Sequence, residues 1–198
     1  MIRTERVGNL VVLTLDRPDK ANALTAAMLT DLRDAVLAAY DASALILTGN
    51  GRVFSAGADL QDITTLATSP LWEEVSSAIA RHPGLTIAAL NGTLAGGAMG
   101  MALACDMRTA VPSARFFYPV IKMGVRPQPS DPARLIALCG PARARMLLMG
   151  ASKWTADQAL TFGLIDDIAD DPVAAAKDLC AAACAADPAY VRDLKSVL

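Results

Sequence analysis

The chain has 198 residues, a mass of 20.6 kDa and a formal net charge of -2, with 54% hydrophobic and 19% charged residues. This length predicts a single α/β domain over residues 1–198, and the high apolar content excludes a disordered or fibrous protein. The charges are balanced and form no basic block, so nucleic acid and anionic membrane surfaces are not expected as partners. Aromatic residues make up only 5%, which leaves no platform for stacking single-stranded bases.

The cysteine and histidine pattern bears on metals and on cellular compartment. Four cysteines occur without CxxC pairs and His82 is the only histidine, so the familiar zinc-ligand spacings are missing. We therefore expect no metal and reduced thiols. The N-terminus carries Arg3, Glu5 and Arg6 in place of an apolar core, so we expect no cleaved signal peptide and a cytoplasmic location.

The first half of the chain alternates strand and helix patterns. A β-branched run ends at Asp16 and Pro18, and Thr25 is a suitable N-cap for the helix that follows it. The short apolar runs have the composition of strands that are covered on both faces. In chain order, we predict a strand at 10–15, a helix at 26–40, a strand at 44–47, a helix at 72–81, a strand at 85–90 and a helix at 98–104.

The second half continues the alternation. We predict strands at 107–111 and 114–117, helices at 131–139, 142–149 and 155–162, a strand at 164–168 and helices at 171–186 and 188–198. No Gly/Ser-rich or Pro-rich linker and no fixed repeat divides the chain. The alternation therefore predicts one α/β domain with buried sheets.

One uncharged stretch needs separate treatment. Residues Pro83 to Cys105 carry no charge over 23 positions, which is long enough to span a bilayer. Asn91-Gly92 is a turn signal, and further glycines interrupt the stretch. We interpret it as a buried strand, a turn and a buried helix in preference to a transmembrane span, and we expect no membrane partner.

Two segments contain the small residues that let a ligand approach bare backbone. They are Phe54–Leu60, which follows a glycine turn, and Leu94–Gly100, which opens a predicted helix. Backbone N–H groups at a helix start lack an intrahelical partner and can hold a developing oxyanion. The alternative is that the Gly and Ala residues serve only tight packing of helix against strand.

The order of motifs in the chain is more specific than either segment alone. The motifs are Arg17-Pro18…Asn22-Ala23-Leu24, Leu47-Thr48-Gly49-Asn50-Gly51…Phe54-Ser55-Ala56-Gly57-Ala58-Asp59-Leu60, Ile87-Ala88-Ala89-Leu90-Asn91-Gly92…Gly96-Gly97, Cys105-Asp106 and Gly163-Leu164-Ile165-Asp166. From about residue 8 onward, this order resembles the enoyl-CoA hydratase/isomerase (crotonase) family. The resemblance implies an α/β fold of the ClpP/crotonase type, a stacked ββα superhelix with two roughly perpendicular sheets. It also implies that the C-terminal helical region is shortened here.

The resemblance also implies a ligand and an oxyanion hole. Family members bind acyl-CoA thioesters in fatty acid metabolism, so coenzyme A would be part of the substrate and no separate cofactor is expected. The thioester oxygen would lie between the backbone N–H groups of Ala58 and Gly97. The implied substrate-binding residues are Ala23, Ala56, Ala58, Asp59, Leu60, Gln61, Gly96 and Gly97. Asp59 is also expected to bind loop amides, and the family's usual assembly implies a homo-oligomer, a trimer or hexamer.

The sequence departs from the hydratase pattern at both acid/base positions. Gly100 stands three residues beyond the oxyanion glycine, where the hydratases of the family carry one glutamate. Val120 follows Pro119, where they carry the second. Hydration of a double bond needs one group to activate water and one to deliver a proton. The sequence therefore favours an isomerase, a decarboxylase or another lyase over a hydratase.

Two residues remain as candidate acid/base groups. Asp131 is the nearest carboxylate to a further family position at about Gln128, although it also suits a helix N-cap. Tyr118 is close in sequence to the missing second glutamate, although it also suits a packing role. Asp106 is expected to be structural.

Two other function classes stay open at this point. A protein that keeps the oxyanion N–H groups and has lost the carboxylates would be a catalytically silent acyl-CoA binder or a partner subunit. Ser55 with His82 as its base would make a serine hydrolase, but Val53 stands where the nucleophile elbow has its first glycine. The alternative for His82 is an ordinary loop residue.

Overall fold

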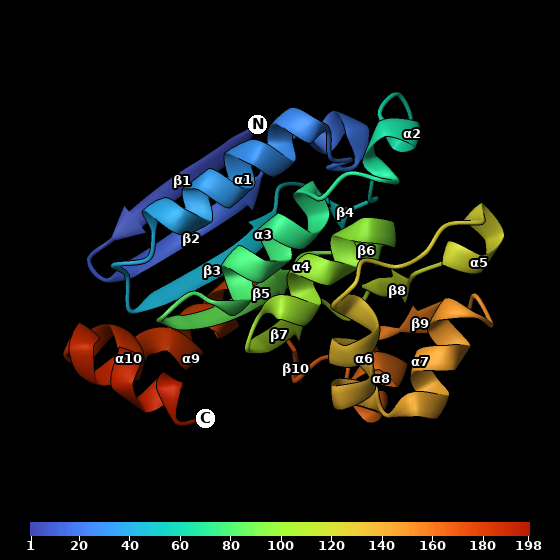
Figure 1. The fold of residues 1–198 in the computed structure, drawn as a ribbon. Coiled ribbons are helices and arrows are strands. Elements are labelled where there is room, and N and C mark those ends of the chain that lie inside the picture. The colour runs from blue at the N-terminus through green and yellow to red at the C-terminus, as the bar shows by residue number, and fades with distance from the viewer.

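The computed structural model describes residues 1–198, and from β3 to β8 its successive strands alternate between two sheets (Figure 1). The strands β2 and β3, β3 and β5, and β5 and β7 pair in parallel, as do β4 and β6, and β6 and β8. The larger sheet has the order β1 (Ile2–Val7), β2 (Leu10–Leu15), β3 (Ala44–Gly49), β5 (Leu85–Leu90), β7 (Met107–Ala110) and β10 (Asp167–Ile168). The smaller sheet has the order β4 (Val53–Ser55), β6 (Thr93–Ala95), β8 (Arg115–Phe117) and β9 (Trp154–Thr155).

A repeated β-β-α unit produces this arrangement. The pairs β3–β4, β5–β6 and β7–β8 each place one strand in each sheet, and a helix follows each pair. The predicted α/β fold of stacked ββα units is confirmed. The helical segments are η1 (Pro18–Lys20), α1 (Ala26–Ala38), α2 (Ile63–Leu66), α3 (Leu71–Ala80), η2 (Gly96–Ala98), α4 (Met99–Ala104), α5 (Val120–Met123), α6 (Asp131–Cys139), α7 (Pro141–Leu148), α8 (Ala156–Phe162), α9 (Pro172–Ala185) and α10 (Pro188–Ser196).

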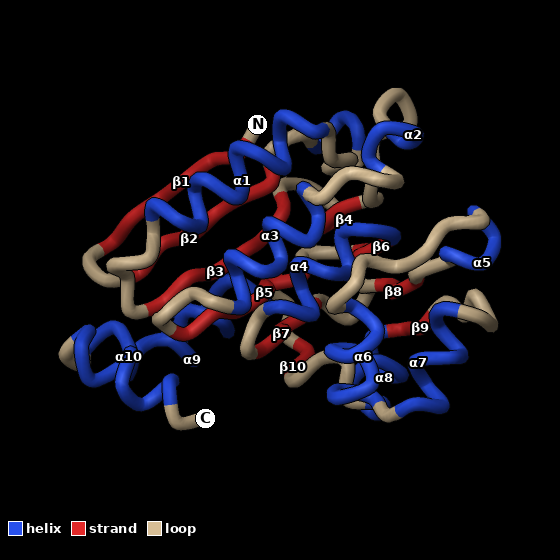
Figure 2. Tube along the Cα trace, in the orientation of Figure 1, coloured by secondary structure: helices blue, strands red, loops and turns tan.

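Helices cover both faces of the larger sheet (Figure 2). On β3, Leu45 and Leu47 join the main core with α1 and α3, whereas Ala44 and Ile46 face α9 in a second, smaller core. This alternation explains why the strand is apolar throughout, since successive side chains point to opposite faces and both faces are covered.

The uncharged stretch 83–105 contains β5, β6, η2 and α4, so it is a strand, a turn and a helix as predicted, with one additional short strand. None of the helices combines the length and apolar character that crossing a bilayer requires.

Several short or polar elements differ from the prediction. Strand β1 pairs along its whole length with β2, but it lies at the sheet edge and is largely exposed, so its sequence lacks a hydrophobic pattern. Strands β4, β6 and β9 and helices α2 and α5 have two to four residues each, which is too short to show a period. The strand predicted at 164–168 forms only at β10.

Candidate active site

A cleft of about 210 Å³ lies between the smaller sheet and helices α2, α3 and α5, and 13 of its 18 lining residues are hydrophobic. Both small-residue segments contribute to the lining of this cleft. Ala58 lies just after β4, and Gly97 lies just after β6. Parallel pairing of β4 with β6 brings these two strand ends to one edge of the sheet. The fold thus joins two segments that are far apart in sequence.

The backbone around Gly57 shows how closely the two segments approach. Gly57 has φ +95°, and a Cβ there would lie 3.0 Å from the Ala95 carbonyl oxygen and 3.6 Å from the Gly97 nitrogen. A side chain at position 57 would therefore be strained and would press on the second segment. Leu24 forms an isolated parallel bridge with Ala58 and fixes this loop from its other side.

Both predicted oxyanion donors are available. The Ala58 N–H donates to no group in the protein. The backbone bonds to Leu24 are made on either side of it, by the Gly57 carbonyl oxygen and the Asp59 N–H. Gly97 lies in the first turn of η2, where N–H groups have no intrahelical acceptor. Two free N–H groups at one cleft are what a thioester oxygen would require.

Trp72 forms the wall behind the second donor, and the sequence analysis did not identify it. It is 4% exposed and lines the cleft from α3. A Cβ at Gly97 would lie 3.1 Å from its ring, so the indole packs directly against the glycine backbone. A helical tryptophan carries no signal of function in the sequence. The same is true of Met123 and Arg126, which also line the cleft from the segment around α5.

Asp131 and Tyr118 are in contact. The Tyr118 hydroxyl donates to Asp131 Oδ2 at 2.8 Å and accepts from the Gln128 N–H at 3.4 Å. Tyr118 lines the cleft, whereas Asp131 is 1% exposed and lies behind it. Burial raises the pKa of the Asp131 carboxyl to about 6, and it raises the pKa of the Tyr118 hydroxyl above its usual range.

Gly100 makes room for this carboxyl. A Cβ at Gly100 would lie 2.7 Å from Asp131 Oδ1 and 3.2 Å from Oδ2. Asp131 Oδ1 is buried and has no hydrogen-bond partner. The first residue of α6 therefore places its carboxyl against α4, the helix that continues from Gly97. Asp131 is not the N-cap of α6; Ser130 occupies that position.

The other predicted binding residues separate into two groups. Ala56, Leu60 and Gly96 line the cleft, and Leu60 is 83% exposed. Ala23, Asp59 and Gln61 do not line it.

Asp59 has a structural role of the kind expected for it. Its carboxylate accepts from Arg17 Nη1 at 2.5 Å and from the Gln61 N–H at 2.9 Å. These bonds, led by the one from Gln61, lower the pKa of Asp59, which therefore stays ionised.

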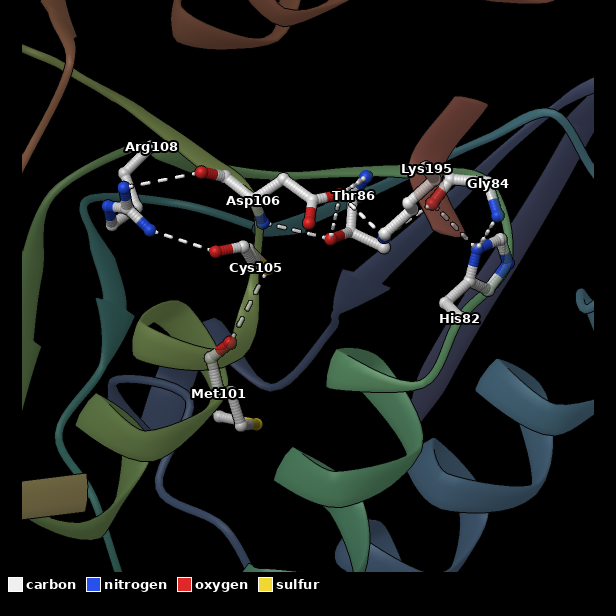
Figure 3. Close-up of polar contacts among 8 residues, drawn as sticks. All are labelled: His82, Gly84, Thr86, Met101, Cys105, Asp106, Arg108 and Lys195. Atoms are coloured by element: carbon white, nitrogen blue, oxygen red, sulfur yellow. Dashed lines mark hydrogen bonds and ion pairs between the residues drawn. The ribbon is translucent and has the colours of Figure 1, made fainter. Parts of the chain in front are cut away.

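The structure does not support the serine hydrolase. His82 Nδ1 accepts from the Gly84 N–H at 3.0 Å (Figure 3). His82 Nε2 lies 2.9 Å from the Ala39 carbonyl oxygen. The Ser55 hydroxyl donates to the Asn22 carbonyl oxygen at 2.8 Å. Neither residue bonds the other, so the pairing of Ser55 with His82 is wrong. His82 is 1% exposed, and burial lowers its pKa, so it is a buried neutral turn residue.

Asp106 also has a structural environment, as predicted. Its Oδ2 accepts from the Thr86 N–H at 2.7 Å and from Lys195 Nζ at 2.6 Å (Figure 3). Lys195 also donates to the Gly84 carbonyl oxygen at 2.7 Å. One lysine thus fastens α10 to the start of β5 and to the segment before β7.

Comparison with known proteins gives the family of this chain. Residues 5–198 match the family model described as enoyl-CoA hydratase/isomerase. The chain belongs to the enoyl-CoA hydratase/isomerase family. A probable enoyl-CoA hydratase of Mycobacterium bovis is 34% identical over 171 residues, covering 85% of this chain and 70% of the relative. A crotonyl-CoA hydratase of Syntrophomonas wolfei is 35% identical over 174 residues, covering 83% and 67%.

Solved structures extend the family likeness to the whole fold. The enoyl-CoA hydratase of Bacillus anthracis superposes with a TM-score of 0.92 at 26% identity, over 98% of this chain and 81% of that one. DspI of Pseudomonas aeruginosa superposes with a TM-score of 0.91 at 29% identity, over 98% and 84%. The predicted crotonase-like fold is therefore confirmed.

Proposed function

We propose that this family member is an acyl-CoA enzyme that stabilises an enolate with the backbone N–H groups of Ala58 and Gly97. The observation that carries the proposal is the meeting of these two free donors at one largely apolar cleft. When a base removes a proton from C2 of a thioester, the C–H electron pair forms the enolate and negative charge develops on oxygen. Each preorganised donor of this kind typically contributes roughly 2.7–4 kcal/mol to the transition state.

The acid/base groups favour isomerase, decarboxylase or other lyase chemistry over hydration. Asp131 is the candidate carboxyl and Tyr118 the candidate hydroxyl beside it. A pKa of about 6 suits a group that gives and takes protons near neutral pH. Positions 100 and 120 carry Gly and Val, neither of which can activate water. We also propose a cytoplasmic location and a homo-oligomeric assembly, a trimer or hexamer. Light scattering of the purified protein would test the number of subunits.

Ligand binding is the first test. Calorimetry with acetyl-CoA, free CoA and a free fatty acid should show that the CoA compounds bind and the fatty acid does not, because the nucleotide and pantetheine supply much of the recognition. Equal or absent binding of all three would contradict the proposal.

Turnover is the second test. In heavy water, the protein should incorporate deuterium at C2 of a bound acyl-CoA, while hydration of crotonyl-CoA should be undetectable. Gly97→Pro removes one donor and should abolish the exchange, provided that circular dichroism shows a folded protein. Rapid hydration would show that the acid/base residues are placed wrongly.

A silent acyl-CoA binder or partner subunit is the second candidate function. It is favoured by one observation, namely that no Asp or Glu lines the cleft, since Asp131 is closed off behind Tyr118. Tight thioester binding without any C2 exchange, across several acyl chain lengths, would support this candidate over the enzyme.

A further inference from the structure

We infer that Tyr118 is the catalytic residue that exchanges a proton with the substrate, and that Asp131 is a positioning residue that acts through the Tyr118 hydroxyl. This inference rests on the proposed enolate chemistry of the same cleft.

Access to the cleft distinguishes the two residues. Tyr118 lines the cleft together with Ala58 and Gly97, whereas Asp131 does not. Tyr118 is also the only tyrosine among the 18 lining residues, and the lining includes no carboxylate, cysteine or histidine. A base must reach within hydrogen-bond distance of the proton that it removes. Tyr118 contributes to the cleft surface that a substrate would touch, and Asp131 does not.

Strand register places Tyr118 next to the oxyanion hole. In the parallel pair of β6 and β8, Phe117 lies opposite Ala95. Tyr118 is the next residue after Phe117, and Gly96 and Gly97 are the next residues after Ala95. Since neighbouring strands lie about 4.7–4.9 Å apart, the Tyr118 backbone leaves the sheet beside the segment that presents the Gly97 N–H.

The hydroxyl has spare capacity to accept a proton. A tyrosine hydroxyl carries one donor and two acceptor lone pairs. In Tyr118 the donor goes to Asp131 Oδ2 at 2.8 Å, and one lone pair accepts the longer bond from Gln128. One lone pair is left for a proton from the substrate.

The Tyr118 hydroxyl makes the one side-chain hydrogen bond to the Asp131 carboxylate. Oδ1 has no hydrogen-bond partner and lies against the bare backbone of Gly100, while Oδ2 accepts from the Tyr118 hydroxyl. The backbone N–H of Gln128 also favours the ionised carboxylate. The other charged groups that act on Asp131 are Glu73 of α3, which disfavours its ionisation, and Arg134 of α6, which favours it. Glu73 is itself occupied by hydrogen bonds from Ser130.

The step conserves atoms and charge. The C2–H bond breaks, its electron pair forms the enolate, and the proton goes to the Tyr118 oxygen. The phenolic proton moves at the same time to the Asp131 carboxylate. Tyr118 ends as a neutral hydroxyl, Asp131 as a neutral carboxyl, and the negative charge lies on the enolate oxygen. Reversal of the same transfer returns the proton to carbon.

The experiment measures deuterium incorporation at C2 of acetyl-CoA by mass spectrometry, with acetyl-CoA affinity measured in parallel. Tyr118→Phe keeps the ring, removes the hydroxyl, and should reduce exchange by at least about 100-fold while affinity is retained. Asp131→Asn should cause a loss of similar size. Tyr40→Phe is the matched control, because the Tyr40 hydroxyl donates to the Ala78 carbonyl oxygen at 2.8 Å, outside the cleft. This variant should exchange deuterium at the wild-type rate.

The pH profile separates positioning by Asp131 from a structural role. Wild-type exchange should rise with pH through about 6, as Asp131 becomes ionised, and Asp131→Asn should lose this inflection. If Tyr118→Phe fails to fold, a fluorotyrosine at position 118 keeps the ring and hydroxyl and changes only the acidity. The relay predicts a changed exchange rate for that protein, and a packing role predicts none.

Each alternative outcome has a distinct meaning. If Tyr118→Phe exchanges within tenfold of the wild type, Tyr118 carries no proton and the inference fails while the proposed function stands. If that variant loses acetyl-CoA binding, Tyr118 is a binding residue and the inference fails again. If the wild type binds acetyl-CoA without exchange, both the inference and the enzymatic function fail.

Discussion

The contact between Gly100 and Asp131 leads to a prediction about stability that does not depend on any reaction. Gly100→Ala would place a methyl group 2.7 Å from Asp131 Oδ1 and 3.2 Å from Oδ2. Both residues are buried, so the carboxyl has to move and its bond from Tyr118 is strained. Overpacking of this kind typically costs roughly 1–3 kcal/mol, and a hydrogen bond to a charged group contributes roughly 1.5–3 kcal/mol.

The opposing term is the helix propensity of alanine. Replacing glycine by alanine in the middle of a helix gains roughly 0.5–1 kcal/mol when nothing obstructs the methyl group. Gly100 is the second residue of α4, so the gain there is at most of this size. We therefore expect Gly100→Ala to lower the free energy of unfolding by about 1–3 kcal/mol. In an Asp131→Ala background the obstruction is gone, so the same substitution should be neutral or stabilising.

Urea unfolding of the four proteins in this cycle tests the sign reversal. The coupling between positions 100 and 131 should be at least about 1 kcal/mol, within the range known for residues in direct contact. An equal effect of Gly100→Ala in both backgrounds would show that the Asp131 carboxyl does not occupy the space that Gly100 leaves open. The placement of Asp131 in the candidate site would then be refuted.

Three further predictions concern single residues. Burial raises the pKa of Asp131 to about 6, so the native state holds this proton more tightly than the unfolded chain does. The free energy of unfolding should therefore fall as pH rises from about 4 to about 7. In urea unfolding, Asp131→Asn should remove roughly 2–3 kcal/mol of this pH dependence. His82→Ala should lower the free energy of unfolding by roughly 2–3 kcal/mol and change C2 exchange by less than tenfold, whereas a larger loss of exchange would revive histidine chemistry. Lys195→Met should speed the hydrogen exchange of backbone amides in α10 and lower the free energy of global unfolding by less than about 1 kcal/mol. Lys177→Met is the control, because Lys177 is exposed and forms no ion pair.

The regular elements of the fold could be predicted because their sequences carry a period or a cap. Helix α1 begins after Thr25, whose hydroxyl accepts from the Met28 N–H at 3.2 Å, and strands β2 and β5 have the predicted bounds. Strand β1 could not be predicted, because it is an exposed edge strand that depends on pairing with β2. The strands of the smaller sheet are too short to show a period in the sequence, and they are recognised only by their pairing with neighbouring strands.

The two small-residue segments of the cleft were identifiable from local composition, but the candidate acid/base pair depends on a contact that no local pattern shows. Asp131 and Gly100 lie on different helices, and the glycine is explained only by the carboxyl that packs against it. The sequence indicated helix capping for Asp131 as readily as chemistry. Trp72 was missed for the same reason, since its contact with Gly97 depends on how α3 packs on η2.

The position of the proton at the start of the reaction separates the remaining reaction types. Isomerisation takes a proton from one carbon and returns it to another, so a single carrier suffices and Asp131 must begin ionised. Decarboxylation releases carbon dioxide first and then needs a proton at carbon, so Asp131 must begin protonated. Because the Asp131 pKa is raised to about 6, isomerisation should become faster as pH rises through that value, and decarboxylation limited by proton delivery should become slower. Rates measured from about pH 5 to pH 8 with a 3-enoyl-CoA and with a carboxylated acyl-CoA would give slopes of opposite sign, and a flat profile for both would mean that Asp131 takes no part.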